Sequence, residues 1–173
     1  MELINKVDKE FVINSFTAEN TLHQYSAAVT DIGLWESEKN FFRKHLSLSG
    51  SILDIGCGAG RTTFGLQTIG YENITGLDLC PSMIKEAKIH CEKFNLKINL
   101  VVGDACSLSF EDETFDACLF SFNGLMQIPK IENRIKALSE IYRVLKPGGV
   151  TRRRKPSERY LTWLECSIFG REN

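Results

Sequence analysis

Short apolar runs alternate with amphipathic segments through the middle of the chain. The runs Ile52–Ile55, Ile74–Asp78 and Ile98–Val102 have the length of buried strands and are separated by longer segments. Phe115–Phe122 is almost continuously apolar, which is typical of a strand covered on both faces in a parallel sheet. The pattern therefore predicts four strands.

The intervening segments read as helices. Residues 3–48 have helical character with a break near Thr30–Gly33, and a further helix is expected over 60–69. Pro81 suits the first turn of another helix, over which apolar residues recur every three or four positions. A last stripe runs from Ile131 to Leu145 and ends before Pro147-Gly148-Gly149. This order predicts an α/β fold with a doubly wound, mostly parallel sheet and right-handed crossovers.

The composition changes after the last predicted helix. Residues 1–48 form an expected N-terminal helical lid, residues 49–150 a central domain, and residues 151–173 an atypical basic tail with six Lys/Arg and three Asp/Glu. An apolar strand is expected after Gly149, but the cations Arg152–Lys155 cannot occupy a central strand, because burying unpaired charge is costly. The C-terminal strands are thus expected to be missing or atypical. The open edge of the fourth strand would favour self-association, or be covered by Tyr160–Leu164.

Composition excludes several classes of function. The chain has 173 residues, 43% of them hydrophobic and 25% charged, which fits one soluble domain. A net charge of −1 gives no general attraction to nucleic acid or anionic lipid. The six cysteines contain no CxxC pair, so we expect no metal site and a reducing, cytoplasmic location. Neither an N-terminal signal region nor an apolar run of membrane-spanning length is present, so no membrane association is expected.

A glycine-rich segment follows the first predicted strand. Gly56, Gly58 and Gly60 stand where open α/β sheets bind ligands, and Asp78 ends the next strand, where a carboxylate can accept ribose hydroxyls. A dinucleotide motif needs its third glycine one position later. Asp54, two residues before the first glycine, would repel a pyrophosphate but not a sulfonium or ammonium group. The electrostatics therefore favour S-adenosylmethionine over NAD.

Five segments in order resemble the class I S-adenosylmethionine-dependent methyltransferases, over roughly residues 50–149. They are Ile52–Arg61, Gly76–Met83, Gly103–Ala105, Phe115–Phe122 and Val144–Gly149. The resemblance implies a Rossmann-like methyltransferase fold with S-adenosylmethionine bound in residues 49–150. It assigns Asp54, Gly56, Gly58, Gly60, Ser121 and Phe122 to the methionine half, Asp78 to the ribose, and Leu79, Met83, Asp104 and Ala105 to the adenine.

The subgroup most resembles small-molecule methyltransferases related to quinone biosynthesis. Ser121-Phe122-Asn123-Gly124 lacks the Pro-Pro pair of families that methylate bases or amide nitrogens, so a small-molecule acceptor is expected and nucleic acid is not. No His/Asp pair is placed as a general base, and the catalytic residue stays unknown. His23, Tyr25, Trp35 and the loop residues Asn123 and Gln127 are candidates near an acceptor. Two alternatives stay open: the chain is a truncated cofactor-binding relative with little or no activity, or it is an NAD-linked oxidoreductase.

Overall fold

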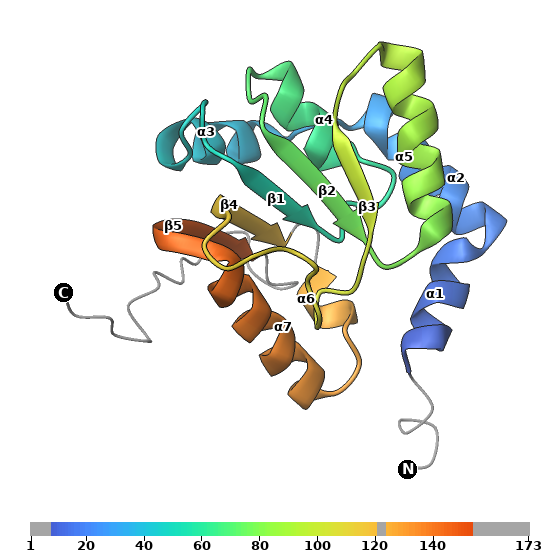
Figure 1. Ribbon diagram of the computed structural model, residues 1–173. Helices are drawn as coiled ribbons and strands as arrows, with labels where there is room; N and C mark the ends of the chain where they lie inside the picture. The colour runs from blue at the N-terminus through green and yellow to red at the C-terminus, as the bar shows by residue number, and fades with distance from the viewer. Residues whose placement is uncertain (1–7, 121–123, 154–173) are drawn as a thin grey trace.

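The structure, a computed structural model, describes residues 8–120 and 124–153, and an all-helical N-terminal part precedes a part that contains both helices and strands (Figure 1). In chain order the elements are α1 (Lys9–Thr17), α2 (Glu19–Asp31), α3 (Glu36–His45), β1 (Ile52–Ile55), α4 (Arg61–Thr68), β2 (Ile74–Asp78), α5 (Pro81–Phe94), β3 (Asn99–Val102), β4 (Phe115–Phe120), α6 (Gly124–Gln127), α7 (Ile131–Val144) and β5 (Leu145–Arg153).

The strands form one parallel sheet in the order β3-β2-β1-β4-β5. The chain builds outward from β1 through β2 to β3, then returns to the other side of β1 with β4 and β5. All four residues of β1 are buried, as expected for the central strand. The predicted α/β, Rossmann-like fold is confirmed, and the place where the strand order reverses, beside β1 and β4, is where such sheets bind ligands.

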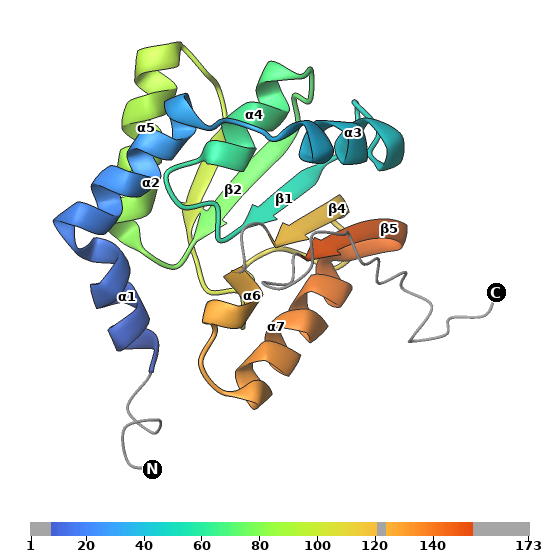
Figure 2. The same cartoon turned by 180° about the vertical axis from the view of Figure 1, so that it is seen from behind.

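Helices cover both faces of this sheet, and alternate strand residues supply the two cores. Leu53, Ile55 and Leu77 face a core that includes Ala137 and Ile141 of α7. The residues of the opposite face, Ile52, Ile74, Ala117 and Leu119, pack with Phe41 and Phe42 of α3 and Leu66 of α4. Figures 1 and 2 show α3, α4 and α5 on one side of the sheet, with α6 and α7 on the other.

The predicted end of the sheet at Gly149 is wrong. Strand β5 continues through the first basic residues and pairs in parallel with β4, so that Thr151 lies opposite Cys118 and Arg153 opposite Phe120. The objection to burying cations applied to a central strand, but β5 is the edge strand of the described sheet, and Val150 and Thr151 are only half-buried. The backbone edge of β4 is therefore paired, which removes the reason given for self-association through it. Residues Tyr160–Leu164 lie outside the described residues.

Helix α7 forms as predicted, but its buried face differs from the apolar stripe. Ala137, Ile141 and Val144 are buried against the sheet, whereas Ile131 and Ile135 are 58% and 57% exposed. The helix thus packs on the sheet with a narrow face that includes a small residue. Its apolar stripe is turned partly toward solvent.

Candidate functional site

The loop between β1 and α4 adopts a backbone conformation that requires glycine. Gly56, Gly58 and Gly60 have φ angles of +68°, +55° and +100°, which side chains disfavour. A Cβ atom on Gly60 would lie 2.5 Å from the ring of Phe64, whereas one on Gly56 would meet nothing closer than 3.5 Å. The loop therefore turns tightly at Gly60, whereas a Cβ atom on Gly56 would make only ordinary van der Waals contacts, the nearest of them with the Phe120 ring.

Asp78 holds this loop to the end of β2. Its Oδ2 accepts a hydrogen bond from the Gly58 amide at 2.8 Å, and its Oδ1 accepts one from the Cys80 amide at 2.8 Å. Burial raises the pKa of the Asp78 carboxyl, while the two amides act in the opposite direction. The carboxylate therefore shapes two loops at the carboxyl edge of the sheet, and each oxygen retains lone-pair capacity for a further donor.

Asp104 stands at the start of the loop after β3. Its Oδ1 accepts from the Cys106 amide at 2.9 Å, and its Oδ2 accepts from Lys9 Nζ of α1 at 2.9 Å. These contacts lower the pKa of Asp104 against the opposing effect of burial. Asp104 thus carries its charge at the same edge of the sheet as Asp78.

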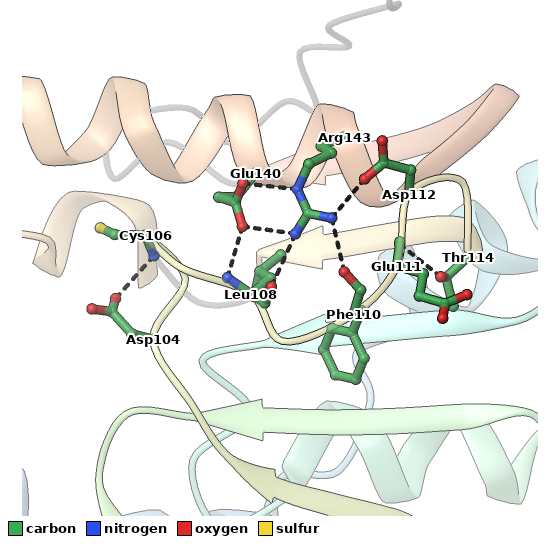
Figure 3. Close-up of polar contacts among 9 residues, drawn as sticks. All are labelled: Asp104, Cys106, Leu108, Phe110, Glu111, Asp112, Thr114, Glu140 and Arg143. Carbon is green, nitrogen blue, oxygen red and sulfur yellow. Dashed lines mark hydrogen bonds and ion pairs between the residues drawn. The ribbon is translucent and has the colours of Figure 1, made fainter.

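Arg143 of α7 fastens the loop that follows Asp104 (Figure 3). Its guanidinium donates to the carbonyls of Leu108 and Phe110 and to the carboxylates of Glu140 and Asp112, over 2.8–2.9 Å. Glu140 also accepts from the Leu108 amide at 2.8 Å, and Arg143 lowers the pKa of this carboxyl. The position of the loop therefore depends on α7.

A cavity of about 440 Å³ lies at the carboxyl edge of the sheet, within the range of small-molecule sites. Of the predicted cofactor residues it is lined by Gly56, Asp78, Leu79, Asp104 and Ala105. These residues come from the ends of three successive strands. The cavity thus brings together the loop, carboxylate and apolar groups that the sequence placed at one edge.

Of the other predicted cofactor residues, those that the structure describes do not line this cavity. Asp54 is fully buried beneath the loop, where its Oδ2 accepts from the Thr63 hydroxyl at 2.7 Å. Gly58 and Gly60 shape the loop, and Met83 is buried in a cluster with Ala59 and Cys80. Ser121 and Phe122 lie outside the described residues, as does Asn123.

Helix α1 supplies cavity walls that the sequence did not single out. Lys9, Val12 and Phe16 lie three and four positions apart on one helical face and line the cavity. Gln127, at the end of α6, and residues at the start of α7 line another wall. In the sequence these α1 residues form only an apolar and basic stripe, and such a stripe does not indicate which part of the protein it contacts.

The lid candidates separate into two groups. The Tyr25 ring lies against the glycine loop, because a Cβ on Gly58 would be 3.0 Å from its Cδ1, and burial and the Asp78 charge raise the pKa of Tyr25. Trp35 instead begins α3, with the Arg61 guanidinium 5.3 Å from its ring centroid, so its role is packing. His23 is exposed and does not line the cavity.

A buried ion pair next to the loop was not predicted. Arg61, directly after Gly60, donates to both carboxylate oxygens of Glu38 at 2.8 and 3.0 Å and to the Gly33 carbonyl. Their side chains are only 9% and 5% exposed. The pair ties the beginning of α4 to α3. Its two members are far apart in sequence and carry no shared local pattern.

Two kinds of feature are absent from the described residues. No group of three or more His, Cys, Asp or Glu side chains among them is arranged to hold a metal ion. Within the same ranges, no helix has both the length and the apolarity needed to cross a bilayer.

Comparison with known proteins gives consistent results. A methyltransferase domain family matches residues 52–149. The chain is 34% identical over 155 residues to a demethylmenaquinone methyltransferase of Lactobacillus johnsonii, covering 86% of this chain and 62% of that protein. It is 36% identical over 100 residues to the sterol 24-C-methyltransferase of Saccharomyces cerevisiae, covering 57% of this chain and 25% of that protein.

A solved structure agrees with these relatives. A crystal structure from Methanococcus maripaludis, described as a putative S-adenosyl-L-methionine-dependent methyltransferase, superposes with a TM-score of 0.62 at 25% identity, covering 84% of this chain and 62% of that one. The chain thus spans less than two thirds of each relative compared. With the family match across more than half its length, the chain belongs to the class I methyltransferase domain family, whose cofactor is S-adenosylmethionine.

Proposed function

We propose that this chain binds S-adenosylmethionine in the cavity at the carboxyl edge of the sheet and transfers its methyl group to a small-molecule acceptor. The observation that carries the proposal is the pair of carboxylates, Asp78 and Asp104, at the ends of adjacent strands beside a glycine loop. Both carboxylates can accept hydrogen bonds from the hydroxyl and amino groups of such a cofactor.

The residues suggest how the cofactor would be held. Asp78 would accept the ribose hydroxyls, and Asp104 would accept the adenine amino group. Leu79 and Ala105 offer apolar surface for the adenine between them, and the cavity wall at Gly56 suits the methionine half. Asp54, Gly58, Gly60 and Met83 would act indirectly, by shaping and supporting the loop. Ser121 and Phe122 remain assigned by family resemblance alone.

The bound cofactor would supply a sulfonium methyl group for an in-line displacement. The contribution of this chain is then to position the reactants and exclude water, effects that are worth a large part of such a barrier. Val12 and Phe16 would exclude water from the α1 side, while Gln127 offers a polar group on the α6 side. No residue is assigned as a general base.

The acceptor class follows from the relatives. The demethylmenaquinone and sterol methyltransferases are named for small, largely apolar acceptors, and we propose an acceptor of that kind rather than a nucleic acid.

We propose a reducing, cytoplasmic compartment for this protein. The proposal is supported by the cysteines of the described residues, which are free thiols: Cys57, Cys80, Cys91, Cys106 and Cys118.

Calorimetry with S-adenosylhomocysteine and NAD, measured side by side, tests the cofactor. Asp78→Ala should weaken S-adenosylhomocysteine binding by about 1–3 kcal/mol, because it removes a charged acceptor and the bond that holds Gly58. Glu72→Ala is the matched control, since Glu72 is exposed near the opposite end of β2 and should leave the affinity unchanged. An unchanged affinity in Asp78→Ala, or preferential binding of NAD, contradicts the assignment. Binding without turnover of a demethylmenaquinone or a sterol favours the inactive relative.

A further inference from the structure

Helix α1 is attached at its C-terminal end by polar contacts to Cys80, the N-cap of α5, and to Ser82 in the first turn of α5. The Thr17 hydroxyl accepts from the Ser82 hydroxyl at 3.2 Å and lies 3.3 Å from Cys80 Sγ. The helix breaks at Ala18, which has φ −57° and ψ 134°, and Phe16 of α1 packs edge-on against Tyr25 of α2 with ring centroids 5.6 Å apart. No residue of α1 is fully buried, and Figures 1 and 2 show α1 at the outside of the molecule. This end is the natural hinge of the helix.

The N-terminal end of α1 is held differently. Lys9 Nζ donates to Asp104 Oδ2 at 2.9 Å, across the cavity that both residues line. The neighbouring Asp8 side chain is occupied in capping the helix, because it accepts from the Phe11 amide. Helix α2 has a firmer attachment, in which the Ser26 hydroxyl lies 2.8 Å from both Glu86 and His90 of α5. Among the contacts of the described residues, the ion pair between Lys9 and Asp104 therefore holds the N-terminal end of α1 to the loop after β3.

That ion pair occupies the carboxylate proposed for the cofactor. Asp104 Oδ1 is directed to the Cys106 amide within its own loop, and Oδ2 faces Lys9 (Figure 3 shows the Cys106 contact). An incoming adenine amino group must share or take the position beside Oδ2, since the other oxygen holds the loop. The side chains of Lys9 and Asp104 are 57% and 30% exposed, so water can replace either partner at modest cost.

We propose that Lys9 is an ionic latch that holds α1 across the cavity and is exchanged at Asp104 for the adenine amino group when the cofactor binds. The proposal rests on the proposed function. Lys9 moves to solvent in the exchange, while α1 stays hinged at Thr17 and keeps Val12 and Phe16 toward the cavity. The latch thus opposes cofactor binding slightly, because the ion pair must break before the adenine amino group can take its position at Asp104.

Lys9→Met tests the latch, because methionine keeps an apolar stem of similar length without the charge. Lys39→Met is the matched control, since Lys39 makes an exposed ion pair with Glu36 at 3.3 Å, away from the cavity. In the ligand-free protein, hydrogen exchange of the amides of α1 should be several-fold faster in Lys9→Met and unchanged in Lys39→Met. This first measurement needs no ligand.

Calorimetry with two nucleosides supplies the second measurement. Lys9→Met should bind adenosine and S-adenosylhomocysteine about two- to fivefold more tightly, the range expected for an exposed ion pair. Purine riboside lacks the exocyclic amino group and should bind wild type and variant equally. Raising NaCl from 20 to 500 mM should improve adenosine binding to the wild type and leave Lys9→Met unaffected, because salt screens the latch.

The outcomes separate the latch from the function beneath it. Unchanged α1 exchange, weaker or equal adenosine binding in Lys9→Met, or an equal gain for purine riboside would each overturn the latch. If the wild-type protein binds neither adenosine nor S-adenosylhomocysteine, the proposed function itself fails, and the latch fails with it as a cofactor gate.

Discussion

Replacing Glu38 with alanine should destabilise the protein far more than replacing any surface glutamate. Glu38 neutralises the buried Arg61 through two short hydrogen bonds and also accepts from the Trp35 amide at 3.0 Å. In Glu38→Ala the guanidinium keeps its bonds to the Gly33 carbonyl and the Thr62 hydroxyl but loses this carboxylate. Removing one partner of a buried ion pair costs about 3–5 kcal/mol.

This loss is large beside the total stability of a domain. Natural domains unfold with about 5–15 kcal/mol, and for a chain of this size each kcal/mol changes the melting temperature by about 2–4 °C. We therefore expect the melting temperature of Glu38→Ala to fall by about 6–20 °C. Because Arg61 begins α4 directly after Gly60, S-adenosylhomocysteine binding should weaken in the same variant.

Equilibrium urea unfolding, followed by circular dichroism, is the assay. Glu36→Ala is the control, since Glu36 lies two residues away on the same helix and makes only an exposed pair with Lys39; its effect should stay within about 0.5 kcal/mol. The double variant Glu38→Leu with Arg61→Met should recover most of the loss, because both charges are then absent. A loss below about 1 kcal/mol in Glu38→Ala, with an unchanged urea dependence, would refute the reasoning.

Two further predictions concern the amino edge of the sheet and its last strand. Lys146 and Ser51 donate hydrogen bonds to Asp116 and lower the pKa of its carboxyl from 3.8 to about 2. The resulting stabilisation is about 1 kcal/mol, after allowance for a side chain that is 44% exposed. It is present above pH 4 and is lost as the pH falls from about 4 through 2. Acid unfolding of Asp116→Asn should lack that component, and a pH profile identical to wild type would contradict it. Truncation after Gly149 should cause aggregation, measured by light scattering, because it removes Val150–Arg153, which pair with β4. Truncation after Arg153 should leave the oligomeric state of the full chain unchanged. Equal behaviour of the two truncated chains would show that these residues of β5 are dispensable.

Much of the fold could be predicted because strand and helix periods are local properties. The run Ile52–Ile55 is apolar for the length of a strand and is followed by glycines, so its place in a parallel sheet follows from the sequence. The shared location of Asp78 and Asp104 also follows, since carboxyl ends of parallel strands meet at one edge. These features needed no knowledge of distant contacts.

The remaining features depend on contacts between distant segments. Cations are excluded from a central strand but tolerated in an edge strand, and the sequence alone does not indicate that β5 lies at the edge of the described sheet. Lys9 and Asp104 are far apart in the sequence, and no sequence pattern indicates that they make contact. The same is true of Arg61 and Glu38. Which flank of α7 is buried depends on how that helix crosses the sheet, and its apolar spacing alone did not determine this.

The position of β1 in the sheet has a consequence for the order of folding. Ile52 pairs with Ile74, roughly 20 residues later, and with Ala117, roughly 65 residues later, so the two pairings close loops of very different entropy. On a ribosome the β1–β2–β3 half can begin to assemble while β4 is still unmade. The residues that line the cavity, however, extend from Asp8 to Lys136 along the chain. A ligand of this site can therefore stabilise the finished fold by mass action but cannot assist its early steps.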